Sequence, residues 1–355
     1  MIQTALIRIL LAPFSLLYGL AIAFRNILYK QEVLRPAKFD IPVISVGNLS
    51  IGGTGKSPHI EYLMEWLKQY IPVAVLSRGY KRETTGFLTG HQVQNVKQIG
   101  DEPYQFMIKF PDVPVAVSES RELGIPMLLK YYPDTKLILL DDAFQHLSVK
   151  PYINILLTSY DSPFTEDYLL PSGRLREWRS SYKRADIIIV TKCPVGLTQE
   201  DIMPLKKRIN TQSYQTIFFS EYRYLLPYFI FNRSTTYSWK KEVYILLLSG
   251  IANTAYLETY IKQRVTYVHL LPFADHHWYT NYDLGQIKRH FDELPGPDKI
   301  IITTEKDATR LSLHREYIIE NKLPIFVIPV EVNFLWNDED RFKETIAQKL
   351  LEFKS

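Results

Sequence analysis

The stretch from Val43 to Pro58 constrains the fold most strongly, because it joins a buried apolar strand to a glycine-rich turn and then to Gly-Lys-Ser. This layout is typical of a phosphate-binding loop, in which backbone N–H groups surround phosphate oxygens. In that pattern Lys56 reaches the β- and γ-phosphates and the Ser57 hydroxyl ligates Mg²⁺. The strict pattern asks for glycine six residues before the lysine, and Ser50 stands there. We predict that nucleotide phosphates are bound by Ser50, Ile51, Gly52, Gly53, Thr54, Gly55, Lys56 and Ser57.

Composition restricts the kind of protein that carries this motif. The chain has 355 residues, 46% of them hydrophobic, which suggests two domains or one large domain with an appendage. Its single cysteine, Cys193, excludes internal disulfides and cysteine-based zinc sites. The net charge of +4 resides in residues 1–38, and the rest of the chain is neutral overall. A basic N-terminus without long Lys/Arg tracts elsewhere favours anionic lipid over nucleic acid as a partner.

The N-terminus is both basic and apolar. Ile9–Phe24 is almost entirely apolar, but its 16 residues fall short of the roughly 20 that a membrane-crossing helix needs. Arg8 and Arg25 bracket it, and Pro13 should end or kink a helix in its middle. The segment fits an interfacial membrane helix, a secretory signal peptide or an ordinary packed helix. Because ATP is a cytoplasmic substrate, the phosphate loop disfavours secretion, and we favour an interfacial anchor over a short single span.

Beyond residue 42, apolar runs of strand length alternate with helical segments. The runs lack in/out alternation, which is typical of a parallel sheet covered on both faces. The predicted strands of the first unit are Val43–Val46, Val73–Ser77, Val113–Val117, Leu137–Leu140, Ile153–Thr158, Asp186–Thr191 and Ile217–Ser220. The predicted helices are His59–Gln69, Glu102–Lys109, Arg121–Tyr131 and Gln199–Asn210. This order predicts an α/β, P-loop NTPase-like domain over residues 33–222, after a membrane-associated helix over residues 1–32.

A second, smaller α/β domain is predicted over residues 241–355. The polar and aromatic stretch 223–240 before it is predicted to be a linker or a pair of strands. The predicted elements are Val243–Leu248, Tyr256–Gln263, Tyr267–Leu271, Asp283–Phe291, Lys299–Thr303, Ile325–Val330 and a last helix, Asp338–Phe353. The cleft between two such domains is a favoured place for a ligand.

Two carboxylates follow the predicted strand Leu137–Leu140. The carboxyl ends of parallel strands line the ligand crevice. Asp141 and Asp142 therefore stand where a Walker B carboxylate holds Mg²⁺, directly or through water. A strand that ends in Asp-Asp is also a common turn signal, so this prediction depends on the phosphate loop in the same sheet.

Asp101 and two histidines carry alternative interpretations. Asp101 precedes Pro103 and a helix, so it is either an N-cap or a carboxylate that takes a proton from an attacking hydroxyl. His276 and His277 point in different directions, so at most one of them should face a given site. They are either structural or, with Asp275 nearby, part of an oriented acid–base pair. The Asp-His-His string also occurs in metallophosphoesterases, but the other carboxylates of such a site are not evident.

Basic segments follow several strands. Residues 174–184 contain five cations and one acid. They form either a solvated loop or an anion clamp, because arginine forks match phosphate oxygens. Ser77–Arg82 is a second basic turn after a strand, and residues 303–307 fall at the mouth of the second domain.

Seven strings of this sequence occur in the order found in a known family. They are Val46–Pro58, Ser77–Tyr80, Gly100–Pro103, Asp141–His146, Gly173–Glu177, Asp275–His276 and Thr304–Asp307. With these strings and its hydrophobic N-terminus, the chain resembles the tetraacyldisaccharide 4′-kinases of lipid A biosynthesis in Gram-negative bacteria over nearly its whole length. Two differences are mild. Ala143 stands where the family usually has glycine, and Ser57 stands where it usually has threonine.

The resemblance implies ATP-dependent phosphorylation of the 4′-hydroxyl of a lipid A disaccharide 1-phosphate, giving lipid IV-A for lipopolysaccharide. The implied catalytic residues are Asp101, His276 and Lys56. The implied Mg²⁺ ligands are Ser57, Asp141, Asp142 and Glu177. The residues implied to lie by substrate or phosphate groups are Arg78, Arg121, His146 and Arg176. We expect a peripheral or monotopic protein at the cytoplasmic face of the inner membrane, with no nucleic acid and no obligate protein partner.

A second class of function remains open, a P-loop GTPase or ATPase that acts as a switch or targeting factor at the membrane. The Asn-Lys-x-Asp guanine signature does not occur in the sequence, and Thr191–Pro194 is the nearest string. A purely structural membrane protein would not need a phosphate loop and strand-end carboxylates together. The enzyme and the switch differ in whether ATP consumption requires a glycolipid acceptor.

Overall fold

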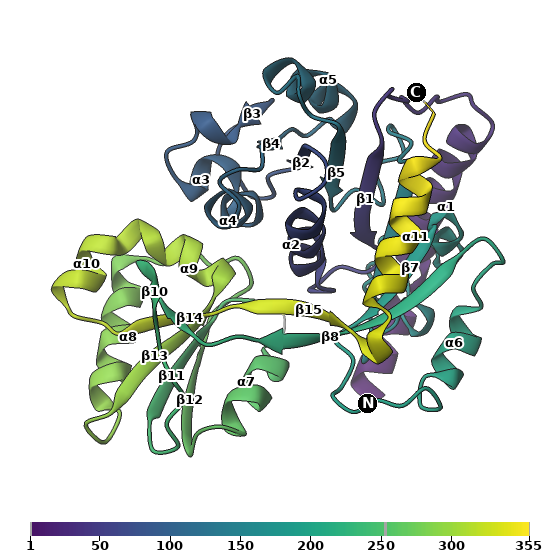
Figure 1. The fold of residues 1–355 in the computed structure, drawn as a ribbon. Helices are drawn as coiled ribbons and strands as arrows, with labels where there is room; N and C mark the ends of the chain where they lie inside the picture. The colour runs from purple at the N-terminus through teal and green to yellow at the C-terminus, as the bar shows by residue number, and fades with distance from the viewer. Residues whose placement is uncertain (1, 252–253, 355) are drawn as a thin grey trace.

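The computed structural model describes residues 2–251 and 254–354 and consists of two α/β units joined by an antiparallel ribbon (Figure 1). The first unit is built on a nine-stranded sheet with the order β15-β8-β7-β6-β1-β5-β2-β4-β3. All pairs are parallel except β3 with β4 and β15 with β8. Its strands are β1 (Val43–Asn48), β2 (Val73–Ser77), β3 (Leu88–Thr89), β4 (Val115–Val117), β5 (Leu137–Asp141), β6 (Ile153–Ser159), β7 (Ile187–Thr191), β8 (Thr216–Tyr224) and β15 (Val330–Phe334). The expected P-loop NTPase-like parallel sheet is confirmed.

Burial explains why these runs form strands. Every residue of β1, β2, β4, β5 and β7 is buried, as expected for a parallel sheet with both faces covered. The helices of this unit are α2 (Lys56–Leu67), α3 (Val96–Ile99), α4 (Asp101–Lys109), α5 (Arg121–Tyr131), α6 (Met203–Ile209) and α11 (Glu339–Leu351). Parallel pairing places the carboxyl ends of β1, β2, β5 and β7 on one edge, and the glycine-rich loop leaves the sheet there.

The second unit has a six-stranded sheet with the order β10-β9-β14-β13-β11-β12. Its strands are β9 (Tyr228–Phe229), β10 (Asn232–Thr236), β11 (Tyr244–Ser249), β12 (Tyr267–Pro272), β13 (Lys299–Thr304) and β14 (Ile325–Ile328). Its helices are α7 (Ala255–Lys262), α8 (Asn281–Glu293), α9 (Glu305–Leu311) and α10 (Arg315–Glu320). The stretch 223–240, predicted as a linker or paired strands, contains β9 and β10, which pair with each other and extend this sheet through β14.

The end of the chain departs from the predicted domain division. Pro329 interrupts the predicted strand Ile325–Val330 because it has no amide proton to continue the ladder, and the chain then returns to the first unit as β15. β15 pairs with β8, and α11 lies with the first unit (Figure 1). Phe342 of α11 is buried in the same core as Ile44. Residues 330–351 therefore pack as part of the first unit, and the β8–β15 ribbon connects the two units twice.

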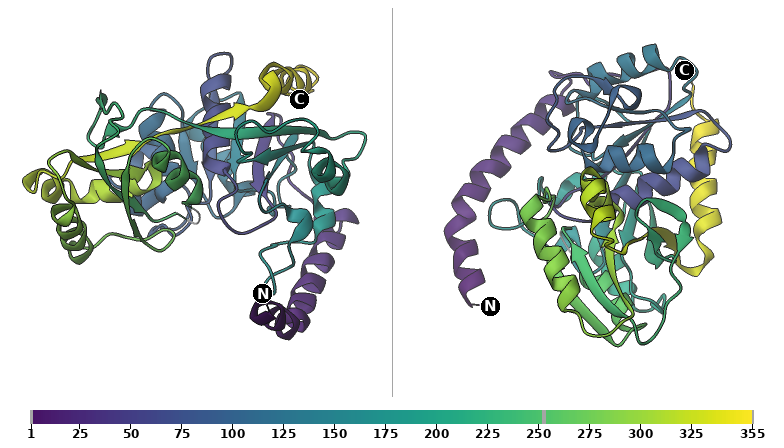
Figure 2. Two further views of the ribbon diagram at one scale, coloured as in Figure 1. Left: turned by 90° about the horizontal axis from the view of Figure 1, so that it is seen from below. Right: turned by 90° about the vertical axis from the view of Figure 1, so that its left-hand side faces the viewer.

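α1 (Ile2–Lys30) is a 29-residue helix that projects from the first unit (Figure 2). It is longer than the apolar run that predicted it, and it does not end at Pro13, which lies inside it. Proline has no N–H to donate to the carbonyl group four residues earlier in the helix. Pro13 is exposed, so that carbonyl group is not enclosed by the protein. An 18-residue window within Ile7–Lys30 has a mean hydropathy of 1.9, so this part of α1 is long and apolar enough to cross a membrane. A single span therefore stands beside the interfacial anchor as an interpretation of α1.

Candidate active site

The glycine-rich loop after β1 has the backbone geometry of a phosphate cradle. Gly52 and Gly55 have φ values of 110° and 89°, which residues with side chains rarely adopt. Gly55 is the N-cap of α2, so the free amides of the first turn of α2 face the loop. Asn48 Nδ2 donates to Thr54 Oγ1 at 2.6 Å across the turn. Of the eight residues predicted to bind phosphates, 50–55 form the loop at the carboxyl edge of the sheet, and Lys56 and Ser57 begin α2.

Lys192, directly after β7, supports this loop. Lys192 Nζ donates to the carbonyl of Gly53 at 2.6 Å. The ammonium group lies between the rings of Tyr222 and Tyr256, 5.7 and 5.6 Å from their centroids. Burial lowers the pKa of Lys192 to about 8. In the sequence, Lys192 drew attention only as part of Thr191–Pro194, the string nearest to a guanine signature. Its position directly after a parallel strand is the signal that could have placed it near the phosphate loop.

Asp142 pairs with the lysine of the loop. Its Oδ1 lies 3.9 Å from Lys56 Nζ, and Arg176 donates to both carboxylate oxygens at 2.7 and 3.1 Å. Burial alone would raise the pKa of Asp142, but these two cations lower it below its ordinary value. Asp142 is therefore a carboxylate held in its ionised form beside the phosphate loop.

Asp141 has an oxygen without a partner. Ser77 donates to Asp141 Oδ2 at 2.9 Å, whereas Oδ1 is buried and accepts no hydrogen bond within the described part of the chain. Burial, with the charges of Glu102 and Asp142, raises the pKa of Asp141 to about 7. A buried oxygen in this state is costly unless a proton or a cation satisfies it.

Glu102 joins this group through Ser57. The Ser57 hydroxyl donates to Glu102 Oε1 at 2.9 Å, and Lys306 of α9 forms an ion pair with the same carboxylate. Burial would raise the pKa of Glu102, but the charges of Lys306 and Lys56 lower it. No local pattern in the sequence gives Glu102 a role, because its contacts come from two distant segments.

The oxygen atoms of Ser57, Asp141 and Asp142 fit Mg²⁺. Among residues 2–251 and 254–354, no three His, Cys, Asp or Glu side chains gather closely enough to hold an ion by themselves. Mg²⁺ needs no such cage, because it usually keeps several waters and takes one or two carboxylates together with substrate phosphates. The partnerless Oδ1 of Asp141 is the observation that supports the fit.

Glu177 makes other contacts. Its side chain is fully buried and accepts hydrogen bonds from Arg25 and Asn26 of α1, at 3.2 and 3.3 Å, and from Arg184 at 2.8 Å. Both carboxylate oxygens are thus committed to α1 and to Arg184. These contacts do not support the predicted role of Glu177 as a metal ligand.

Asp101 and His276 meet across the two units. Asp101 is the first residue of α4, and His276 follows β12; Asp101 Oδ2 lies 2.7 Å from His276 Nδ1. The N-cap of α4 is Gly100, so Asp101 is not the cap. Burial alone would raise the pKa of Asp101, but the hydrogen bond with His276 and the charges of Lys306 and Arg310 lower it to about 2.

His277 faces a different group. His277 Nε2 lies 3.0 Å from Asp283 of α8, and its ring stacks on Phe273. His276 has a φ of 59°, so the backbone turns sharply between the two rings. One of the two adjacent histidines therefore faces Asp101, and the other packs within the second unit.

Three basic residues surround the end of β5. Arg121 is fully buried and donates to the carbonyl of Asp141 at 2.9 Å, so its hydrogen bonds serve the backbone. Arg78 is exposed just after β2. Burial and the positive charges of Arg121 and Arg78 lower the pKa of His146 to about 4. The exposed Arg78 is thus the best placed of the three to meet an anionic group.

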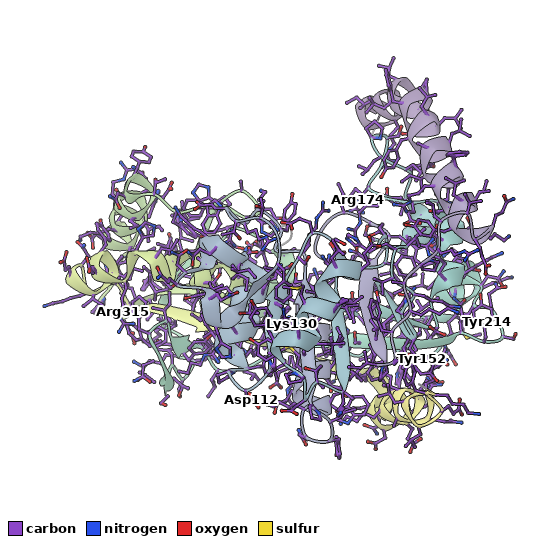
Figure 3. The ribbon with its side chains drawn as sticks, turned by 90° about the horizontal axis from the view of Figure 1, so that it is seen from above. Asp112, Lys130, Tyr152, Arg174, Tyr214 and Arg315 are labelled. Atoms are coloured by element: carbon purple, nitrogen blue, oxygen red, sulfur yellow. The ribbon has the colours of Figure 1, made fainter. Side chains whose placement is uncertain are left out.

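The basic segment 174–184 is neither a free loop nor a single clamp. Four of its cations contact protein groups: Arg176 contacts Asp142, Arg184 contacts Glu177, Arg179 contacts the carbonyl of Asp167, and Arg174 contacts the Asp167 carboxylate at 3.0 Å. Arg174 has more than half of its side chain exposed and lines a cavity of about 450 Å³ together with Arg8 and Leu11 of α1. Figure 3 shows Arg174 beside the projecting helix.

Known proteins share this sequence over its length. The profile of the tetraacyldisaccharide-1-phosphate 4′-kinase family, LpxK, matches residues 7–351. The chain belongs to this family. The tetraacyldisaccharide 4′-kinase of Bacteroides thetaiotaomicron is 44% identical over 347 residues, which cover 95% of this chain and 91% of the relative. The LpxK relative from Flavobacterium johnsoniae is 40% identical over 98% of both chains.

The family likeness extends to the fold. A crystal structure of LpxK from Aquifex aeolicus in complex with ATP matches this chain with a TM-score of 0.73 and 28% identity, over 97% of this chain and 99% of that one. As a member of the LpxK family the chain is a kinase, which removes the switch protein as an interpretation.

Proposed function

We propose that this chain transfers the γ-phosphoryl group of ATP to the 4′-hydroxyl of tetraacyldisaccharide 1-phosphate and so forms lipid IV-A. The observation that carries the proposal is the contact of the buried Asp101 with His276, because Asp101 begins α4 directly beside Glu102, which contacts Ser57. ATP is the ligand of the Aquifex aeolicus structure, and the family name specifies the acceptor.

Asp101 takes the proton of the acceptor hydroxyl. The low pKa of Asp101 keeps it ionised at neutral pH, and His276 orients it through Nδ1. As the acceptor oxygen bonds to the γ-phosphorus, its proton moves to Asp101. The bond between the γ-phosphorus and the β–γ bridging oxygen breaks, and its electron pair leaves with ADP. His276 compensates for the weak basicity of Asp101 by sharing the charge of the proton that the pair receives.

The phosphate loop holds the donor. Lys56 and the amides at the start of α2 bind the β- and γ-phosphate oxygens, and Arg176 lies within reach of the same loop. Ser57, Asp141 and Asp142 are the residues that would hold Mg²⁺. When bound, Mg²⁺ supplies positive charge that neutralises the phosphate oxygens.

α1 brings the enzyme to the surface that contains its lipid acceptor. Its exposed apolar side chains and Arg8 fit contact with an anionic bilayer. The cavity between α1 and Arg174 lies on the same side, and Arg8 and Arg174 are the cations of its mixed-charge lining that could meet the 1-phosphate of the acceptor. The proposal therefore places a peripheral or monotopic enzyme at the cytoplasmic face of the inner membrane, without nucleic acid or an obligate protein partner.

Transfer of label from γ-labelled ATP to tetraacyldisaccharide 1-phosphate tests the proposal. We expect labelled lipid IV-A, formed only with the acceptor present and lost in Lys56→Ala. The matched control is Lys68→Ala, because Lys68 ends the same helix and contacts Glu65 and Asp112 instead of the loop. ATP consumption that is equal with and without the acceptor would contradict the proposal.

A further inference from the structure

α1 has two faces with different surroundings. Five large apolar side chains on one side are each more than 60% exposed: Ile9, Leu10, Phe14, Leu17 and Phe24. The residues that contact the body of the protein recur at helical spacing on the other side and are Ser15, Tyr18, Gly19, Arg25 and Asn26. A helix that only anchored the protein would need the first face alone.

The inner face of α1 is bonded to the segment 169–178. Tyr18 OH donates to the carbonyl of Arg176 at 2.9 Å, and Trp178 Nε1 donates to the carbonyl of Gly19 at 2.8 Å. The absence of a side chain at Gly19 permits this approach, since a methyl group there would collide with the Trp178 ring. The hydrogen bond from Trp178 therefore depends on a residue without a side chain at position 19 of α1.

A buried charge strengthens the attachment. Glu177 is fully buried, and Arg25 and Asn26 of α1 donate to its two oxygens at 3.2 and 3.3 Å. Removing one partner of a buried carboxylate leaves a charge that is poorly compensated. A displacement of α1 would therefore leave the Glu177 carboxylate without two of its hydrogen-bond donors.

The same segment is bonded to the phosphate loop on its other side. The amide of Arg176 donates to the carbonyl of Leu49 at 2.7 Å, and the amide of Ile51 donates to the carbonyl of Arg174 at 2.8 Å. The Arg176 guanidinium donates to the carbonyl of Asn48 at 3.1 Å. The backbone of Arg176 thus accepts from α1 with its carbonyl group and donates to the loop with its amide, so one residue lies between the helix and the loop.

We propose that Tyr18, Gly19 and Arg25 are positioning residues for phosphoryl transfer. By fixing Arg176 and Glu177, the inner face of α1 sets how well the phosphate loop binds nucleotide, independently of the attachment of the outer face to lipid. This role rests on the proposed function and goes beyond membrane anchoring.

The test separates the two faces of α1 in the full-length protein. The inner-face variants are Tyr18→Phe, Gly19→Val and Arg25→Gln, and the outer-face controls are Leu10→Ser and Leu17→Ser. Flotation with vesicles of phosphatidylethanolamine and phosphatidylglycerol measures attachment. The affinity for a non-hydrolysable ATP analogue with Mg²⁺, measured in detergent micelles without an acceptor, reports on the loop.

We expect the inner-face variants to float like the parent but to lose about tenfold in affinity for the analogue, the size expected when a buried polar group loses its partner. The outer-face controls should float poorly and keep the parental affinity in micelles. Arg25→Lys should restore part of the affinity, which a general loss of stability would not allow. Tyr18→Phe removes a single hydroxyl group, so it keeps the test valid if Gly19→Val fails to fold.

Parental affinity in all inner-face variants would overturn the proposal, and so would an equal loss in the outer-face controls. Because the affinity is measured without an acceptor, the result does not depend on the identity of the acceptor. Failure to phosphorylate tetraacyldisaccharide 1-phosphate would count against the proposed function alone.

Discussion

Asp101 and His276 are held together by hydrogen bonding and burial although 175 residues separate them in the chain. We expect Asp101→Ala and His276→Ala each to lower kcat by about a hundredfold or more, with a smaller effect on KM, because general base catalysis contributes at this level. Since the two residues act as one unit, the double variant should be little worse than the worse single variant. Steady-state kinetics of the three variants measures this.

His277→Ala is the matched control for that comparison, since His277 contacts Asp283 and should leave kcat near the parental value. Losses that multiply fully in the double variant would assign separate roles to Asp101 and His276.

Lys192 predicts a pH dependence of nucleotide binding. The pKa of Lys192 is lowered to about 8, so the ammonium group that donates to Gly53 becomes neutral as pH rises through that value. Affinity for the ATP analogue should therefore be highest below about pH 8 and should fall above it. Lys192→Arg keeps its charge and should flatten the decline, whereas Lys192→Met should bind weakly at every pH. Identical pH profiles in all three proteins would show that the charge of Lys192 does not affect nucleotide binding by the loop.

At the scale of elements, the segment 174–184 divides its cations between two tasks. Arg176 is committed to Asp142 and Asn48, whereas Arg174 faces the cavity beside α1. We expect Arg176→Ala to lower kcat/KM by about tenfold on acceptors with and without the 1-phosphate, since a charge-assisted contact at the donor side is lost. Arg174→Ala should be harmful only when the acceptor carries the 1-phosphate.

The comparison of the two acceptors decides between these roles. If Arg176→Ala is harmful only with the phosphorylated acceptor, Arg176 recognises the acceptor, as a single anion clamp would require. Arg176→Lys should recover only part of the loss, because the planar fork that spans Asp142 is not restored.

At the scale of the whole molecule, Lys109 joins the two units. Its ammonium group donates to Glu61 of α2 at 2.7 Å and to Glu305 of α9 at 2.9 Å. Burial and the charge of Glu305 raise the pKa of Glu61 from 4.5 to about 7, even though Lys109 opposes the shift. One lysine therefore compensates two buried carboxylates.

This arrangement predicts how stability depends on pH. As pH rises from 4.5 to about 7, the unfolded chain has released the Glu61 proton while the folded protein still holds it, so the free energy of unfolding falls across this window. Glu61→Gln should remove this decline, as measured by urea unfolding at several pH values. Glu65→Gln on the same helix is the control, because Glu65 is exposed and pairs with Lys68 at the surface. Parallel pH curves for the parent and Glu61→Gln would contradict the prediction.

Much of the fold is readable from the sequence because burial patterns are local. Runs such as Val73–Ser77 and Arg121–Tyr131 were predicted with the bounds that the structure has, since every residue of that strand is apolar or small and Ser120 caps that helix. The phosphate loop is equally local, because glycine, lysine and serine act within one turn. The positions of residues 50–57 and of the carboxylates at the end of β5 could therefore be predicted from local sequence.

Other features depend on contacts that no local pattern encodes. The residue patterns left Asp101 open between a cap and a base. The structure has Gly100 as the N-cap of α4 and brings His276 against Asp101 from the other unit. In the sequence, Glu177 is the one acid of a basic segment. In the structure it is buried against α1 and accepts hydrogen bonds from Arg25 and Asn26.

The sequence by itself determined the parallel α/β sheet, the phosphate loop and the apolar N-terminal helix, because each arises from residues close together in the chain. Only the tertiary structure decided the return of β15 and α11 to the first unit, the Asp101–His276 pair and the attachment of α1 to Arg176. The physical reason is that these contacts join segments far apart in the chain. Their geometry is set by the β8–β15 ribbon and by the packing of buried charges, and neither has a periodic signature in the sequence.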